Sequence, residues 1–175
     1  SRGSGPVKSL GSGSLNKLLD RVSSDRNVKG LVLRVLSPGG SAVASDLICR
    51  KLEEISQKKS VVISMSDVAA SGGYLISLGA HKIVADSMTI TGSIGIVSGK
   101  FDLNGLYAKL GITKESVIKA KNALMFSPNK GFSKDEEKKL LEIMEFYYEQ
   151  FVTKVSLARK MDFIKAEQVS RGRVW

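Results

Sequence analysis

Short apolar runs alternate with segments of helical periodicity along this chain, and no other feature of the sequence constrains the fold as strongly. The runs VKGLVLRVLS and KSVVISMS are typical of buried strands, and a helix is predicted between them from about Ser41 to Gln57. A shorter helix, Gly72 to Gly79, precedes a further strand, HKIVAD. Strands that alternate with helices predict an α/β domain around a largely parallel sheet, with functional sites at the carboxyl ends of the strands.

The second half of the chain predicts a strand in TITGSIGIVSG, a helix around Leu103 to Leu110, an extended ESVIKAK and a long helix from about Ser133 to Met161. Ser133 and Glu136 form a capping-box pattern at the start of that helix. The helix is longer than one small domain needs, so part of it is expected to face another subunit. Its predicted packing stripe consists of Leu140, Met144, Tyr147, Phe151, Val155 and Ala158.

Composition sets the limits for the class of protein. With 175 residues and 42% hydrophobic content, residues 15–175 are predicted to form one globular core domain, whereas Ser1 to Ser14 is Gly/Ser-rich and is predicted to be a flexible segment or an expression remnant. The single Cys49 excludes an internal disulfide framework. No apolar run is long enough to span a bilayer. The net charge of +10 comes without a nucleic-acid-binding motif, so we expect a solvated basic face or attraction to an anionic membrane surface, and no nucleic-acid partner.

Ser71 in the string AASGGY is the first candidate for chemistry. A nucleophilic serine needs an exposed hydroxyl at a tight strand-to-helix turn, with small neighbours and with backbone N–H groups free to hold an oxyanion. The residues around Ser71 meet these needs, and the N–H of Gly72 is expected at the start of a helix. The alternative is a plain helix N-cap, which is the commoner explanation of such a string taken alone.

A second glycine-rich turn, SPGGS, follows the first predicted strand. The pair Gly39 and Gly40 permits a backbone conformation whose N–H groups point outward, and such groups could supply the other oxyanion donor. The alternative is an ordinary strand-to-helix turn. The string lacks the pattern of a phosphate-binding loop or of a dinucleotide fingerprint.

A general base is harder to find. The only histidine, His81, is expected at the far end of the helix that follows Ser71, and eight helical residues span about 12 Å, too far for a hydrogen bond. A lysine with a lowered pKa could serve instead. Lys119 and Lys121 are the best placed, because they lie among apolar residues in VIKAKNALMF. The alternative is that both are snorkelling lysines on an edge strand.

The strings VLRVLSPGGSAVASD, SMSDVAASGGY, TGSIGI and RGRVW resemble the signal peptide peptidase A (protease IV) family of Ser/Lys-dyad peptidases, over roughly Leu15 to Trp175. The resemblance implies the Clp-protease/crotonase-like fold, an α/β spiral of strand-strand-helix units. It implies that Ser71 is the nucleophile, that the glycines of SPGG (Gly39 and Gly40) and Gly72 form the oxyanion region, and that Ser93 hydrogen-bonds the lysine. Lys121 matches the general base best because KNALMFSP ends in Ser-Pro, with Lys119 as the alternative.

The same resemblance carries expectations about function. The family degrades signal peptides left in membranes, needs no metal or cofactor, and assembles into homo-oligomers. We therefore expect peptide substrates and a membrane-associated enzyme, on the extracytoplasmic face in a bacterium or in the plastid membrane of a plant or alga. Related sequences continue at both ends, so this chain looks like the core of a longer protein. An acyl-CoA hydratase or isomerase on the same fold, and a catalytically silent scaffold of the same family, remain as alternatives.

Overall fold

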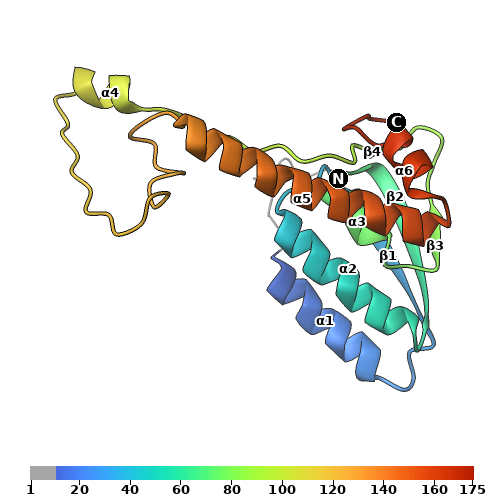
Figure 1. Cartoon of the computed structure of the whole chain (residues 1–175). Helices are drawn as coiled ribbons and strands as arrows, with labels where there is room; N and C mark the ends of the chain where they lie inside the picture. Colours follow the sequence, from blue (N-terminus) through green and yellow to red (C-terminus); the bar gives the residue numbers. More distant parts are fainter. Residues whose placement is uncertain (1–10) are drawn as a thin grey trace. The chain divides into compact units, whose positions relative to one another are not determined.

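The computed structural model describes residues 11–175 (Figure 1). The elements in chain order are α1 (Ser12–Ser24), β1 (Gly30–Ser37), α2 (Ala42–Ser56), β2 (Ser60–Ala70), α3 (Gly72–Ser77), β3 (Lys82–Val84), β4 (Ile90–Gly92), α4 (Asn104–Lys109), α5 (Lys134–Arg159) and α6 (Phe163–Val169). Strands and helices alternate through the first half of this series, as the sequence predicts.

The chain divides into two compact units, which are described separately. The first unit joins Ser1–Gly95 to Gln150–Trp175 and holds the sheet, and the second is Ile96–Glu149. The second unit is largely irregular, and α4 and the first part of α5 are its helical elements.

β2 is the central strand of the sheet, and β1, β3 and β4 each pair with it in parallel. β1 lies along one edge of β2, with Gly30 opposite Ser60 and Ser37 opposite Ala69. β3 and then β4 lie along the other edge. This confirms the predicted parallel α/β sheet. Because β1 and β2 end at the same edge, the two glycine-rich turns that follow them lie next to each other.

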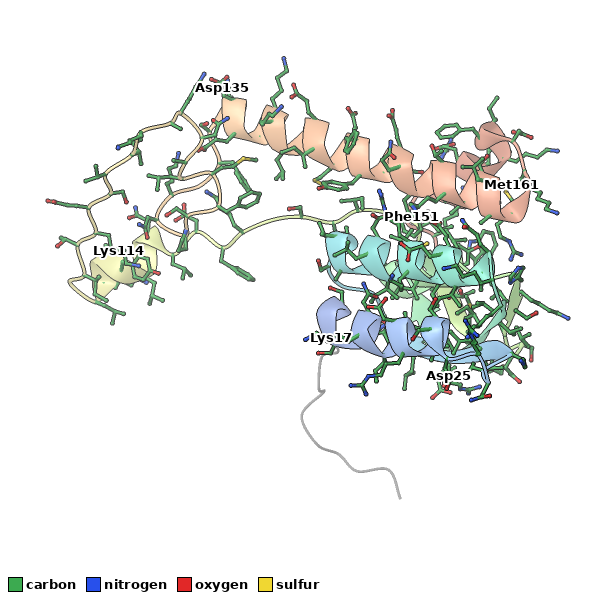
Figure 2. The ribbon with its side chains drawn as sticks, turned by 90° about the horizontal axis from the view of Figure 1, so that it is seen from below. Lys17, Asp25, Lys114, Asp135, Phe151 and Met161 are labelled. Carbon is green, nitrogen blue, oxygen red and sulfur yellow. The ribbon has the colours of Figure 1, made fainter. Side chains whose placement is uncertain are left out.

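One face of the sheet is covered by helices. The buried side chains on this side come from α1, α2, β1 and β2, namely Leu19, Val35, Ile48, Leu52, Ile55, Val61, Ile63 and Met65. Beyond α2, the carboxyl-terminal half of α5 lies along the sheet unit, where Lys154 pairs with Asp46 and Glu53 of α2 and Phe151 is buried (Figure 2). Alternate residues of β1 on the other face, Val32 and Leu36, are exposed.

Several local predictions need correction. α1 begins at Ser12, inside the stretch Ser1 to Ser14 that was predicted to be flexible, while residues 1–10 lie outside the described part. The strand in TITGSIGIVSG shortens to the three residues of β4, and ESVIKAK forms no strand. A strand needs a ladder partner, and Val117 in that segment is fully exposed. α6 was not predicted.

The start of α5 confirms the predicted capping box. The Ser133 hydroxyl accepts a bond from the Glu136 N–H at 3.2 Å, and the Glu136 carboxylate accepts one from the Ser133 N–H at 2.9 Å. The predicted packing stripe is only partly right, because Leu140, Phe151 and Val155 are buried but Tyr147 is exposed. Leu140 belongs to the unit 96–149, whereas Phe151 and Val155 belong to the sheet unit, so the stripe is buried in two separate stretches of the helix and Tyr147 lies between them.

Candidate active site

Ser71 occupies a strained turn between β2 and α3. Its backbone has φ 51° and ψ −120°, a conformation with positive φ that residues other than glycine rarely adopt. It is the N-cap of α3, yet its side chain makes no capping hydrogen bond. Ser41, the N-cap of α2, does cap its helix, because its hydroxyl accepts from the Ala44 N–H at 3.3 Å. The hydroxyl of Ser71 is therefore not used for capping, which was the alternative explanation of AASGGY.

Small residues around Ser71 are a steric requirement of this turn. A Cβ on Gly73 would lie 2.7 Å from the Ser37 carbonyl oxygen, and a Cβ on Gly72 would collide with Ser45 Oγ. Ala69 and Ala70 are both buried at the end of β2. The start of α3 thus packs directly on the carboxyl end of β1 and the first turns of α2, and no larger side chain fits there.

The SPGG turn lies against Ser71, as the sequence predicts. Gly39 has φ +110°, and a Cβ built on it would lie 2.7 Å from Ser71 Cβ, 2.9 Å from the Gly72 nitrogen and 3.0 Å from Ser71 Oγ. A Cβ on Gly72 would in turn lie 3.4 Å from the Gly40 nitrogen. The structure therefore brings Gly39, Gly40, Ser71 and Gly72 together at one edge of the sheet.

The N–H groups at this edge differ in their availability. The Gly39 N–H donates to Ser37 Oγ at 3.1 Å. No hydrogen bond is recorded from the N–H of Gly40 or of Gly72 to any described residue of the chain. Gly72 is the first residue of α3, where N–H groups have no partner within the helix. Gly40 and Gly72 are therefore better placed than Gly39 to donate to an oxyanion.

We expect Gly39→Ala to lower by about 100-fold or more the kcat of a reaction that uses the Ser71 hydroxyl, because the added methyl would displace Ser71 and the Gly72 nitrogen from their positions. Steady-state kinetics on the purified full-length protein measures this. Gly13→Ala in α1 is the control, since nothing lies within 4 Å of that position. Full activity in Gly39→Ala would show that the turn does not need to approach Ser71 closely.

Ser93 follows the strand that supports Ser71. The Ser71 N–H donates to the Gly92 carbonyl at 2.8 Å, so the turn is fixed to β4 by its backbone. Ser93 itself has φ 48°, and its N–H donates to the Arg173 carbonyl at 2.6 Å. The structure thus places Ser93 directly after Gly92, the residue that accepts from Ser71, and within the same unit.

Sequence reasoning missed the role of the last residues of the chain. Thr91 and Trp175 exchange two backbone hydrogen bonds, at 2.8 and 3.0 Å, and Val174 forms an antiparallel bridge with Gly92. A Cβ on Gly92 would lie 2.6 Å from the Trp175 ring. This segment holds β4 from the side opposite β2. The string RGRVW contains these residues, but no local pattern in the sequence predicts that it pairs with TGSIG.

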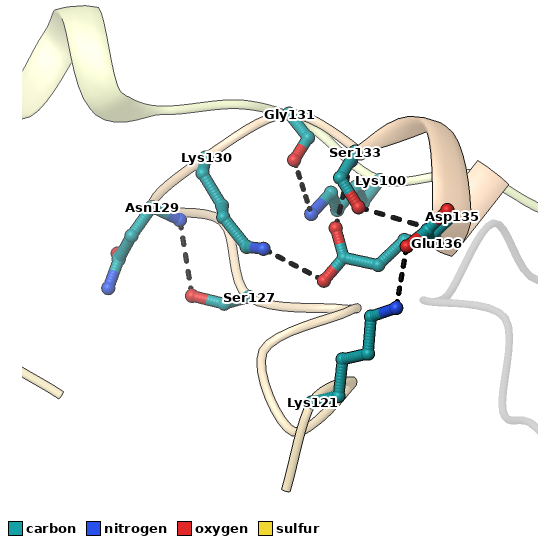
Figure 3. A network of polar contacts seen from close by, with 9 residues as sticks. All are labelled: Lys100, Lys121, Ser127, Asn129, Lys130, Gly131, Ser133, Asp135 and Glu136. Carbon is teal, nitrogen blue, oxygen red and sulfur yellow. Dashed lines mark hydrogen bonds and ion pairs between the residues drawn. The ribbon is translucent and has the colours of Figure 1, made fainter. Parts of the chain in front are cut away.

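Lys121 and Lys119 belong to the unit 96–149 and are described within it. The Lys121 ammonium pairs with the Asp135 carboxylate at 2.6 Å, and both side chains are mostly exposed, at 77% and 67% (Figure 3). The hydrogen bond to Asp135 raises the pKa of Lys121. This differs from the lowered pKa that a lysine base requires, because here the amine faces a carboxylate. Lys119 is exposed in an irregular segment.

His81 was considered from the sequence, and Asp67 is the carboxylate nearest to Ser71 along the chain. His81 precedes β3, where its Nδ1 accepts a bond from the Val61 N–H at 3.1 Å, in keeping with the structural role expected for it. Asp67 lines a cavity of about 550 Å³ together with Arg34 and Asp86. Arg34 donates to the hydroxyls of Ser64 and Ser66 in this cavity. Asp67 is thus an exposed residue of this cavity.

A parallel α/β sheet with a strained serine in one of two adjacent glycine-rich turns defines the class of this unit, and solved structures show the same fold. A ClpP1 mutant from Listeria monocytogenes superposes with a TM-score of 0.54 at 15% identity, over 91% of this chain and 72% of that chain. A membrane-bound stomatin-specific protease, solved as a lysine-to-alanine mutant with a substrate peptide, gives 0.54 at 20% identity, over 90% and 60%. The predicted ClpP-like fold class is confirmed.

Sequence comparison identifies the family. The pattern of peptidase family S49 matches residues 53–175, and the chain belongs to this family. It is 41% identical to the chloroplastic serine protease SPPA of Arabidopsis thaliana, over 100% of this chain and 27% of that protein. It is 35% identical to protease 4 of Haemophilus influenzae, over 99% of this chain and 28% of that protein. The chain thus spans little more than a quarter of the length of these two relatives.

Proposed function

We propose that this chain is the core of a serine peptidase in which Ser71 is the nucleophile. The observation that carries the proposal is the Ser71 turn, where a serine takes a strained backbone conformation without using its hydroxyl for capping. Strained strand-to-helix turns present a nucleophile at the edge of an α/β sheet. Membership of family S49 and relatives named as serine proteases support the same conclusion.

The proposed reaction is acyl transfer with a lysine base. Neutral Lys121 takes the proton from Ser71, whose oxygen then attacks the scissile carbonyl. The N–H groups of Gly40 and Gly72, with Gly39 shaping the turn, hold the oxyanion. The carbon–nitrogen bond breaks, the amine leaves with the proton from the lysine, and water then releases the acyl-enzyme. Ser93 orients the lysine by a hydroxyl hydrogen bond. Lys119 is the alternative base.

The substrates proposed are extended peptides, including signal peptides that remain in a membrane. Glycines and alanines around Ser71 leave room for a peptide backbone to approach the hydroxyl. The named relatives include a chloroplastic enzyme and a bacterial one, which supports a membrane-associated peptidase of a plastid or of the extracytoplasmic face of a bacterium. No helix among residues 11–175 is long and apolar enough to cross a bilayer.

We also propose a homo-oligomer. The unit 96–149 exposes several large apolar side chains, among them Val97, Phe101, Val117 and Phe146. Few of its side chains are buried. Within residues 96–149 the buried side chains are those of Met125, Glu136 and Leu140. Apolar surface of this extent is typical of an interface between protein chains.

A fluorophosphonate probe tests the proposed function. Such a reagent phosphonylates an activated serine, so we expect labelling of the full-length protein at Ser71 alone, with complete loss in Ser71→Ala. Ser41→Ala is the matched control, because Ser41 follows the other glycine-rich turn but caps its helix. Mass spectrometry identifies the modified residue. A protein that is not labelled would instead be a silent scaffold, or a hydratase that uses the oxyanion site without a nucleophile.

A further inference from the structure

The contact between Lys121 and Asp135 joins the candidate base to the first turn of α5. Asp135 is the second residue of that helix, and Lys121 lies in the irregular segment that precedes it (Figure 3). The Lys121 Nζ to Asp135 Oδ2 distance is 2.6 Å. A carboxylate in the first helical turn is stabilised by the helix dipole, so Asp135 is well suited to remain charged and to hold a cation.

Asp135, and not the adjacent Glu136, is the carboxylate that pairs with Lys121, because other groups bind Glu136. Glu136, the next residue, is 2% exposed, and its two oxygens are occupied by Lys130 at 2.8 Å and by the Ser133 N–H. Lys138, one turn further along α5, also lowers the pKa of Asp135 and so favours its charged form. Lys100, which precedes α4, donates to the carbonyl of Gly131 in the loop before α5. Glu136 fixes the loop to the helix, and Asp135 holds the amine.

We infer that Asp135 is a positioning residue that keeps Lys121 in a protonated resting state, and that the peptidase works only when this ion pair opens. The inference rests on the proposed role of Lys121 as base. Both partners are exposed, and exposed ion pairs are weak, so the pair can open without unfolding the loop. An amine released from Asp135 loses its proton more readily and becomes able to accept one from Ser71.

The pH dependence of Asp135→Asn tests this inference. The ion pair raises the pKa of Lys121, so the neutral amine appears only at higher pH, and removal of the carboxylate shifts its appearance to lower pH. For the full-length protein we expect kcat/KM in Asp135→Asn to be about two- to fivefold higher at neutral pH. Well above the pKa of the lysine, both proteins should have equal rates. Salt at about 1 M should bring the wild type close to the variant, because it screens exposed charges.

Glu142→Gln is the matched control, since it removes another exposed ion pair of α5, with Lys139 at 3.0 Å. It should keep the wild-type profile. Superimposable profiles for wild type and Asp135→Asn, or a lower rate in Asp135→Asn at every pH, would overturn the inference.

A readout independent of catalysis separates this inference from the proposed function. The Lys121 side chain can be titrated by carbon-13 NMR, with Lys121→Arg used to assign its signal. We expect the signal to titrate at lower pH in Asp135→Asn than in the wild type. Equal titration curves would contradict the ion pair between Lys121 and Asp135 in the resting protein. If the titration shifts but Lys121→Ala remains active, the pair exists and the proposed base is wrong.

Discussion

Ser71→Gly is expected to abolish peptidase activity and to make the protein more stable. The loss of the nucleophile should reduce kcat by about 10⁴-fold or more. Glycine adopts the backbone conformation of residue 71, φ 51° and ψ −120°, without the strain that serine bears there. We therefore expect the free energy of unfolding to rise by about 1 kcal/mol. Peptide hydrolysis and urea denaturation of the full-length protein measure the two effects.

Two variants serve as controls for this result. Ser71→Ala should lose the same activity without a gain in stability, because alanine keeps the Cβ that causes the strain. Ser41→Ala removes a true helix cap, so it should cost about 1 kcal/mol and keep the nucleophile intact. Residual hydrolysis at the wild-type rate in Ser71→Ala would contradict the assignment of the nucleophile, and a less stable Ser71→Gly would contradict the strain.

Lys121→Ala is expected to remove activity at every pH tested. A general base contributes about 10²- to 10⁴-fold, and a neutral alanine cannot replace it. Lys121→Arg should not restore activity, because a guanidinium does not release its proton in this range. The wild-type rate should rise with pH, since Asp135 raises the pKa of Lys121 and the neutral amine forms as the pH approaches that pKa.

Lys119→Ala is the matched control, because it removes a lysine from the same irregular segment. It should keep most of the activity. The reverse pattern, with Lys119→Ala inactive and Lys121→Ala active, would show that the base is the other lysine. Pre-steady-state acylation rates for both variants would separate an effect on the chemical step from an effect on substrate binding.

The sequence predicts the sheet and its turns well, because both depend on local patterns. The apolar runs of β1 and β2 and the capping box at Ser133 follow from periodicity and from short-range hydrogen bonding. The proximity of SPGG and AASGGY follows from parallel strands that end at one edge. The strain at Ser71 could not be predicted, because serine is a common N-cap and only the backbone angles distinguish the two roles.

Contacts between distant residues account for what the sequence did not predict. The ion pair of Lys121 with Asp135 depends on the path of an irregular segment, which has no periodicity to interpret. The pairing of Thr91 with Trp175 joins parts of the chain that share no local pattern. ESVIKAK is a strand that the sequence predicts and the structure lacks. Its β-branched residues favour a strand, but they have no ladder partner in the unit 96–149.

The pairing of β4 with the end of the chain has a consequence for the order of folding. Gly92 and Val174 are separated by roughly 80 residues, and contacts of such sequence separation close late because of the loop entropy. During synthesis Ser71 emerges well before Arg173 to Trp175. The backbone bonds between β4 and Arg173 to Trp175 can therefore form only after residues 93–172 have been synthesised. The candidate catalytic edge is therefore expected to be completed later than the pairing of β1 with β2, which joins residues only about 30 apart along the chain.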